Sequence, residues 1–389
     1  MLRPSAVDVL FISKPIAPPF HDGSKCLVRD IATHLERATP VLLSTRGAEP
    51  VGANGHIRMV PVYGDSGRHA PSLRENLRAA GWVLARSRAD LWHFVFAPNP
   101  RTSAVGRLLS GVRRKPVVQT IASPPRRFEK IGRLLFGDVV VAQSRWTADR
   151  VLIACERTGH ALPDVRVIPP PVPTDIVRSP DVQLAARARL DIPPHAPLVI
   201  YPGDLEVSSG GRAALKIAER LQEKVPEAVV LFAYRRKTAA SEVAADELRR
   251  NAPRNARFAA TVPDVLAFVA SAAAVIFPVD DLYGKVDLPI VLLEAMVLGV
   301  PVMVLGHGPL AELEGAEIQS SLDAEIWVET LALWLSDEQR REARIAEQRA
   351  RTIARCSAPT VARAYEDIYL ELGEKRARVA APSTHEAGS

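Results

Sequence analysis

The stretch from Asp287 to Val304, DLPIVLLEAMVLGVPVMV, constrains the fold of this chain more than any other part of the sequence. Its apolar residues predict a buried helix over residues 290–298, followed at once by a buried strand over residues 300–305. Gly299 is suited to end the helix, and Pro301 can open the strand because no ladder N–H is needed there. Such a pair of elements is typical of an α/β protein.

One acid, Glu294, lies inside the apolar part of this stretch. We expect it in the first turn of the helix, where the positive end of the helix dipole favours a carboxylate. In open α/β folds that place is at the mouth of the sheet, where ligands bind. A second interpretation stays open, in which Glu294 only favours the start of the helix.

Size and composition indicate a two-domain globular protein. The chain has 389 residues, of which 47% are hydrophobic and 24% charged, and its formal net charge is +6. A mildly basic chain suits an anionic ligand or an anionic membrane surface. Nucleic acid is not an expected partner, because only 5% of the residues are aromatic and they form no stacking run.

The cysteines and the N-terminus favour a reducing, cytoplasmic location. Cys26, Cys155 and Cys356 are scattered and odd in number, which argues against a disulfide framework and a zinc site. The first apolar run, residues 7–12, is short and contains Asp8, so it predicts a strand rather than a signal peptide. No apolar run reaches the roughly 18 residues of a membrane-spanning helix.

Short apolar runs alternate with segments of helical spacing, which predicts βαβ units and parallel sheets. Strands are expected over residues 7–12, 40–44, 57–62, 91–96, 115–121, 137–142, 165–168, 198–201, 228–233 and 274–278. Further helices are expected over residues 26–35, 73–86, 144–155, 182–190, 213–224, 241–250, 262–272, 325–335, 337–353 and 359–372.

A proline-rich segment divides the chain. Residues 169–173 read PPPVP and residues 193–197 read PPHAP, and both favour stiff, extended backbone. The expected organisation is an N-terminal Rossmann-like domain over residues 1–172, a linker over 173–197, a C-terminal Rossmann-like domain over 198–358, a closing helix over 359–373 and a disordered tail over 374–389.

This order of parts, together with five motifs, resembles the retaining GT-B glycosyltransferases of family 4 type. LPIVLLEAMVLGVPVMV is similar to the donor-site helix of that family, which carries an E-x7-E motif. The other motifs are PPFHDGSKCLVRDIATHL, GDVVVAQSRWTADRVL with VRVIPPPV, YPGDLEVSSGGRAALKIAERL and YEDIYLEL. The resemblance covers most of the chain. It implies the GT-B fold, in which two Rossmann-like domains flank a cleft and a closing helix returns to the N-terminal domain.

The resemblance implies that the chain binds a nucleotide-diphosphate sugar, mainly on the C-terminal domain, and transfers the sugar with retention and without a metal or other cofactor. Glu294 matches the second glutamate of the motif, which accepts hydrogen bonds from the ribose hydroxyls in the family. A charged acceptor facing two hydroxyls is a strong and geometry-specific contact. Gly203, Pro289 and Ile290 belong to the matching segments and are expected in the same donor site.

Four positions depart from the family pattern. Val286 stands where the family has the first glutamate of the motif and cannot accept a hydrogen bond, but the neighbouring Asp287 offers a carboxylate. Asp204 and Ser209 stand where the family has the arginine and the lysine that neutralise the diphosphate, and an acid there repels it. Ala122 stands where the family has a sugar-binding histidine.

Other cations can replace the missing ones if the site has been rebuilt. Lys285, in the loop before the donor-site helix, is the first catalytic candidate because it could stabilise the leaving phosphate, and Asp287 is the second. Further candidates for the diphosphate are Arg235, Arg236 and Lys237, which follow a strand of the same domain, and Arg212. For each cation the alternative is a solvated surface charge.

Gly23 and Ser24 stand just before the first helix, whose free N–H groups could face the anionic donor. The alternative is an ordinary loop with Ser24 as the N-cap. Closure of the two domains would bring these residues and Lys285 to one donor.

Two functions are compatible with the sequence. In the first, the chain is an active hexosyltransferase with a glycan or lipid-linked acceptor, as in envelope or exopolysaccharide assembly. In the second, the fold is kept but catalysis is lost, and the chain is a sugar-nucleotide-binding, glycan-binding or scaffold partner of an active enzyme.

The region between residues 101 and 133 is rich in arginine, and Phe128, Ile131, Leu134 and Leu135 are interleaved with or follow its basic residues. Such a segment could lie on the anionic inner face of a membrane. The alternative is a solvated, arginine-rich helix face.

Overall fold

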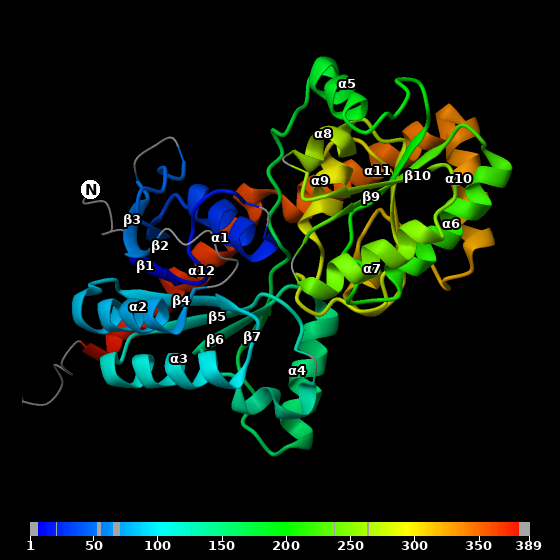
Figure 1. Cartoon of the computed structure of the whole chain (residues 1–389). Helices are drawn as coiled ribbons and strands as arrows, with labels where there is room; N and C mark the ends of the chain where they lie inside the picture. Colours follow the sequence, from blue (N-terminus) through cyan, green and yellow to red (C-terminus); the bar gives the residue numbers. More distant parts are fainter. Residues whose placement is uncertain are drawn as a thin grey trace, which may run out of the picture. The chain divides into compact units, whose positions relative to one another are not determined.

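The structure, a computed structural model, describes residues 7–20, 22–52, 56–64, 71–125, 127–236, 238–262 and 264–380. The chain divides into two compact units. The first unit comprises Met1–Pro171 together with Ala358–Ser389, and the second comprises Val172–Ser357. Each unit is built on one parallel sheet (Figure 1), which confirms the expected α/β fold with two Rossmann-like sheets.

The first unit holds a seven-stranded sheet in the order β3-β2-β1-β4-β5-β6-β7. Its strands are β1 (Val7–Ile12), β2 (Ala38–Thr45), β3 (Arg58–Tyr63), β4 (Leu91–Phe96), β5 (Val117–Ile121), β6 (Val139–Ala142) and β7 (Val165–Val167). Its helices are α1 (Gly23–Thr33), α2 (Leu73–Arg86), α3 (Pro100–Arg113), the 3-10 helix η1 (Phe128–Arg133), α4 (Arg145–Arg157) and α12 (Ala358–Ala380). Helices α1 and α12 cover one face of the sheet, and α2, α3 and α4 cover the other (Figure 1).

The second unit holds a six-stranded sheet in the order β10-β9-β8-β11-β12-β13, so the strand order reverses between β8 and β11. Its strands are β8 (Leu198–Tyr201), β9 (Val229–Tyr234), β10 (Ala256–Ala260), β11 (Ala274–Phe277), β12 (Val302–Leu305) and β13 (Glu317–Gln319). Its helices are α5 (Pro180–Ala188), α6 (Gly210–Lys224), α7 (Ala239–Arg250), α8 (Val265–Ala270), α9 (Ile290–Val297), η2 (Gly308–Glu312), α10 (Ala324–Ser336) and α11 (Glu338–Cys356).

Helix α9 and strand β12 confirm the predicted helix and strand of the apolar stretch. Gly299 follows the helix with a φ of 77°, a left-handed conformation that glycine adopts without strain. The N–H of Val300 donates to the carbonyl of Ala295 at 2.9 Å, and the N–H of Gly299 donates to Met296 at 3.3 Å. These two bonds close the end of the helix, and Pro301 directly precedes the strand as expected.

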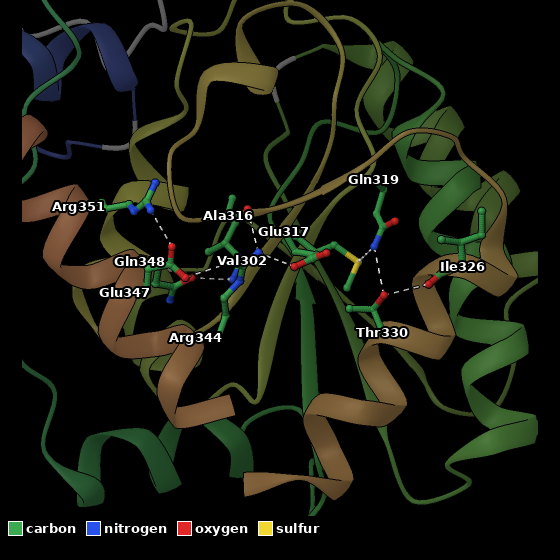
Figure 2. Close-up of polar contacts among 11 residues, drawn as sticks. Val302, Ala316, Glu317, Gln319, Ile326, Thr330, Arg344, Glu347, Gln348 and Arg351 are labelled. Atoms are coloured by element: carbon green, nitrogen blue, oxygen red, sulfur yellow. Dashed lines mark hydrogen bonds and ion pairs between the residues drawn. The ribbon is translucent and has the colours of Figure 1, made fainter. Parts of the chain in front are cut away.

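The side chain of Gln348 in α11 forms hydrogen bonds with the backbone on both sides of Pro301 (Figure 2). Its side chain is fully buried; Nε2 donates to the carbonyl of Val300 at 2.6 Å, and Oε1 accepts from the N–H of Val302 at 3.3 Å. One turn earlier, Arg344 forms an ion pair with Glu317 of β13. Buried backbone groups need such partners, so α11 fixes the turn that positions α9.

Five elements, β10, β13, α3 and the 3-10 helices η1 and η2, are not predicted by the sequence pattern. The two strands lie at the edges of the second sheet, and their sequences, ARFAA and EIQ, lack the continuous apolar run of a central strand. At the C-terminus, α12 extends to Ala380, so residues 374–380 of the expected tail are helical, while 381–389 lie outside the described residues. No helix in the described part of the chain is long and apolar enough to cross a membrane.

The segment after β5 does not present its apolar side chains to a membrane. Ile131 is fully buried and Leu134 is 9% exposed, and both belong to a cluster with Val151 of α4. The ring of Phe128 packs edge-on against Trp146. The expectation of a membrane-facing apolar surface is therefore wrong for this segment, because these side chains form a local core.

Helix α12 completes the core of the first unit, as the resemblance implies for the closing helix. Tyr365 and Tyr369 are fully buried; the hydroxyl of Tyr369 lies 2.8 Å from Nδ1 of His93, whose Nε2 lies 2.7 Å from the hydroxyl of Thr120. Burial lowers the pKa of His93 to about 3. The neutral ring donates through one nitrogen and accepts through the other, so both contacts are hydrogen bonds.

Glu366 of the same helix caps the chain just before β2. Its carboxylate is fully buried, and Oε1 accepts from the N–H groups of Glu36 at 2.6 Å, Arg37 at 2.5 Å and Ala38 at 3.1 Å. Oε2 lies 3.3 Å from Nε of Arg37. One side chain thus joins the C-terminal helix to the N-terminal part of the chain.

We expect Glu366→Ala to lower the free energy of unfolding by about 2–4 kcal/mol, because buried N–H groups lose their acceptor. Glu366→Gln keeps one oxygen and should lose less. The midpoint of urea unfolding, followed by circular dichroism, measures both. Asp367→Ala is the matched control: Asp367 is 71% exposed, and its surface ion pair with Arg37 contributes less than about 1 kcal/mol. An equal loss in the control would contradict this role for Glu366.

Candidate functional site

The point where the strand order of the second sheet reverses positions the candidate site. The loop 202–209 follows β8 and the loop 278–289 follows β11, and both leave the sheet at the carboxyl ends of its strands. Every residue of β8 and β11 is buried, so the packed strands hold the first residues of both loops in place. In doubly wound sheets, ligands bind at this place.

An ion pair joins these two loops. Nζ of Lys285, from the loop after β11, lies 2.8 Å from the carboxylate of Asp204, from the loop after β8. The two side chains are only 10% and 5% exposed, so water screens their attraction weakly. The first catalytic candidate is therefore paired with the acid that departs from the family pattern.

A second polar contact joins the same loops. The backbone N–H and the hydroxyl of Ser209 donate to the carboxylate of Asp280 at 3.0 Å and 2.5 Å. Burial on its own would raise the pKa of Asp280, but the two hydrogen bonds from Ser209, helped by the nearby His307, outweigh it and hold the pKa below its usual value. Ser209 therefore ties the loops together at a position where the family has a lysine.

The side chain of Tyr201, the last residue of β8, contacts the loop 202–209. Its buried hydroxyl donates to the carbonyl of Asp204 at 2.9 Å, and burial raises the pKa of the phenol. A Cβ added to Gly203 would lie 2.3 Å from the tyrosine ring, and one added to Gly210 would lie 2.8 Å from the hydroxyl. The close approach of the ring thus explains both glycines, and the donor-binding role of Gly203 stays a prediction.

Helix α9 follows the second loop directly. Pro289 is its N-cap and Ile290 its first residue, and Asp287 is fully buried in the loop just before them. Glu294 is the fifth residue of the helix and partly exposed, so the expectation of an acid in the first turn is wrong. Because Glu294 lies about one turn further in, the helix dipole favours it less than expected.

Two of the candidate arginines form ion pairs with acids of α7. Arg236 forms an ion pair with Glu242 at 2.8 Å, and Arg212 forms one with Glu247 at 3.0 Å. Arg235 is partly buried after β9, and Lys237 lies outside the described residues. A role of these arginines at a diphosphate stays a prediction, and two of them would have to leave their carboxylate partners to take it.

In the first unit, Gly23 and Ser24 begin α1, but Asp22 is the N-cap rather than Ser24. The carboxylate of Asp22 accepts from the N–H of Ser24 at 2.9 Å and forms an ion pair with Lys14 at 2.7 Å. The carboxylate of Asp22 therefore already occupies the N-terminus of this helix. A donor role for Gly23 and Ser24 stays a prediction, and it would require this carboxylate to move or to share the N–H groups.

Carboxylates outnumber cations in the two loops and α9. The acids are Asp204, Glu206, Asp280, Asp281, Asp287 and Glu294, and Lys285 is the one cation in these segments. Asp280 and Glu206 are not among the residues predicted for the site from the sequence. Each nevertheless lies a few residues after a buried strand, where the loops of a ligand-binding sheet edge begin. Among the described residues, no group of three His, Cys, Asp or Glu side chains is placed to hold a metal ion.

Residues 182–351 match the family model of the glycosyl transferases group 1. The match contains both loops and α9. A search of curated protein sequences gives no match to the chain.

Several solved structures are similar to this chain over most of its length. Anabaena HepE in complex with UDP is 16% identical, with a TM-score of 0.71 over 94% of this chain and 100% of that one. Sucrose-phosphate synthase from Thermosynechococcus elongatus is 15% identical, with a TM-score of 0.71 over 95% and 100%. The α,α-trehalose-phosphate synthase (UDP-forming) from Burkholderia vietnamiensis is 14% identical, with a TM-score of 0.71 over 95% and 98%. The chain thus has the fold of the GT-B glycosyltransferases, and its residues 182–351 match the glycosyl transferases group 1.

Proposed function

We propose that the chain transfers a hexose from a nucleotide-diphosphate sugar to a glycan or lipid-linked acceptor, with retention of configuration and without a metal or other cofactor. The observation that carries the proposal is the position of α9: inside the segment that matches the family, it follows the loop after β11, where the strand order reverses, and it bears Glu294. The solved structures of HepE with UDP and with UDP-glucose support a donor of this class.

In the proposed reaction the acceptor attacks from the face that the diphosphate leaves, so stabilising the leaving phosphate is the main task of the site. Glu294 would accept hydrogen bonds from the ribose hydroxyls. Lys285 supplies a positive charge at the reversal of the strand order, but it is paired with Asp204. The diphosphate would therefore bind by taking over Lys285, with Arg235 or Arg236 as further cations.

The Lys285–Asp204 ion pair also supports a second candidate function. An acid that neutralises the lysine of this loop leaves a site rich in carboxylates, which favours a neutral glycan over a diphosphate. On this second proposal the chain is a catalytically inactive glycan-binding or scaffold partner of another transferase.

The acceptor and the location of the reaction belong to the same proposal. An envelope or exopolysaccharide acceptor would suit a chain that works in the cytoplasm, at the inner face of the membrane. The basic residues of the first unit support a lipid-linked or anionic acceptor, because opposite charges attract.

Calorimetric titration with UDP- and GDP-sugars tests the ribose contact. We expect Glu294→Ala to weaken nucleotide binding by about 10- to 100-fold, the usual effect of losing a hydrogen bond to a charged group. Glu223→Ala, at the far end of α6 where the side chain is 64% exposed, is the matched control and should bind normally. Unchanged binding by Glu294→Ala would remove the proposed ribose contact.

The ion pair can be tested by changing its acid. Asp204→Asn removes a negative charge and releases Lys285, so we expect it to bind the donor on the order of tenfold more tightly. The same change should lower the melting temperature of the unligated protein, because the lysine stays buried without its carboxylate. Asp281→Asn, an equal charge change at an exposed position of the loop after β11, should do neither. Weaker donor binding by Asp204→Asn would mean that the carboxylate itself contacts the donor.

Product analysis separates the two candidate functions. With an α-linked donor, a retaining enzyme gives an α-linked product, which proton NMR recognises from the coupling between the anomeric proton and the proton on the next carbon. Excess EDTA should leave the rate unchanged if no metal takes part. A β-linked product would refute retention, and the absence of hydrolysis and transfer, with or without donor binding, would favour the inactive partner.

A further inference from the structure

The outer face of α3 carries a row of aliphatic side chains that are exposed to solvent. Val105, Leu108 and Val112 are 48%, 65% and 63% exposed. Their spacing of three and four residues places them along one side of the helix, beside the buried side that Ser103, Gly106 and Leu109 form. Single exposed aliphatics are common on protein surfaces, but this row is contiguous.

Packing fixes α3 in this orientation. Gly106 lies so close to Phe136 that an added Cβ would come within 2.3 Å of the ring, and Leu109 is buried in the core beneath the helix. The aliphatic row therefore cannot turn inward without the loss of these contacts.

The same helix and its C-cap are strongly basic. Residues 100–114 contain the exposed arginines Arg101, Arg107, Arg113 and Arg114 and no aspartate or glutamate. Arg107 and Arg113 donate to backbone carbonyls of neighbouring segments. Arg101 and Arg114 have no hydrogen-bond or ion-pair partner for their side chains within the described ranges. The free charges thus flank the aliphatic row at both ends of the helix.

Helix α2 extends this surface. It packs beside α3 on the same face of the first sheet (Figure 1). Leu73 and Leu77, one turn apart, are 75% and 64% exposed, and the adjacent Arg74 and Arg78 are exposed as well. Two neighbouring helices therefore expose the same mixture of aliphatic and arginine side chains.

We propose that the outer face of α3, extended by α2, binds the surface of an anionic phospholipid membrane. Aliphatic side chains on such a face can enter the boundary below the headgroups while arginines contact the phosphates, as in other peripheral helices. A second copy of the chain fits this face less well, because two such faces would bring arginines together. The inference depends on this surface and not on the transferase activity.

Co-sedimentation of the full chain with phosphatidylcholine vesicles, with or without phosphatidylglycerol, tests the proposal. We expect binding only to the vesicles that contain phosphatidylglycerol, and weaker binding as the salt concentration rises. Arg101→Gln/Arg114→Gln should lower the partition coefficient on the order of 25-fold, at roughly fivefold for each arginine. Leu108→Gln/Val112→Gln should lower it on the order of tenfold. Circular dichroism checks that each variant is folded.

The matched control is Val182→Gln/Leu184→Gln on α5, where the two side chains are 43% and 48% exposed, and it should bind vesicles normally. Equal loss in this control, or no binding to anionic vesicles, would overturn the proposal. So would a dimer in sedimentation velocity that Leu108→Gln/Val112→Gln abolishes, because a second copy would then cover the face. Calorimetry with the donor distinguishes the two proposals: the α3 variants should bind it normally whether or not they bind vesicles.

Discussion

Parallel pairing of the strands is the constraint on which the rest of the structure depends. Each strand must be followed by a crossover, so the carboxyl ends of all strands collect at one edge of each sheet. In the second sheet the order reverses between β8 and β11, and the loops after these strands are neighbours although 81 residues separate Asp204 from Lys285. The topology, not a local motif, brings this acid and this lysine within 2.8 Å.

The same ion pair changes how the departures from the family pattern are understood. Taken singly, Asp204 repels a diphosphate and Lys285 attracts it. As a nearly buried pair they neutralise each other, so a donor would gain the lysine only if the carboxylate turned away. The hydrogen bonds from Ser209 to Asp280 hold the same two loops together. The loops are thus held together by contacts that would compete with an anionic ligand, so the proposed binding of a diphosphate depends on this competition.

The sequence predicts the central strands and α9 well, because continuous apolar runs and a glycine after the helix are local signals. The edge strands β10 and β13 escape prediction since they lack such runs. At the site, the helix that bears Glu294 could be predicted, but the pairing of Lys285 with Asp204 could not, because it depends on the fold. The sequence predicts an apolar surface around Ile131, which is buried, whereas the exposed row on α3 has no core-directed pattern to reveal the helix.

The order of segments along the chain has a consequence for the first unit. Its sheet is complete by Val167, yet Tyr365, Tyr369 and Glu366 arrive only after the whole second unit. Without them, His93 and the N–H groups of residues 36–38 would lose their buried hydrogen-bond partners. Because unsatisfied buried polar groups are costly, the first unit cannot reach its native core until the end of the chain is available. The second unit, which lies within one continuous segment, has no such dependence.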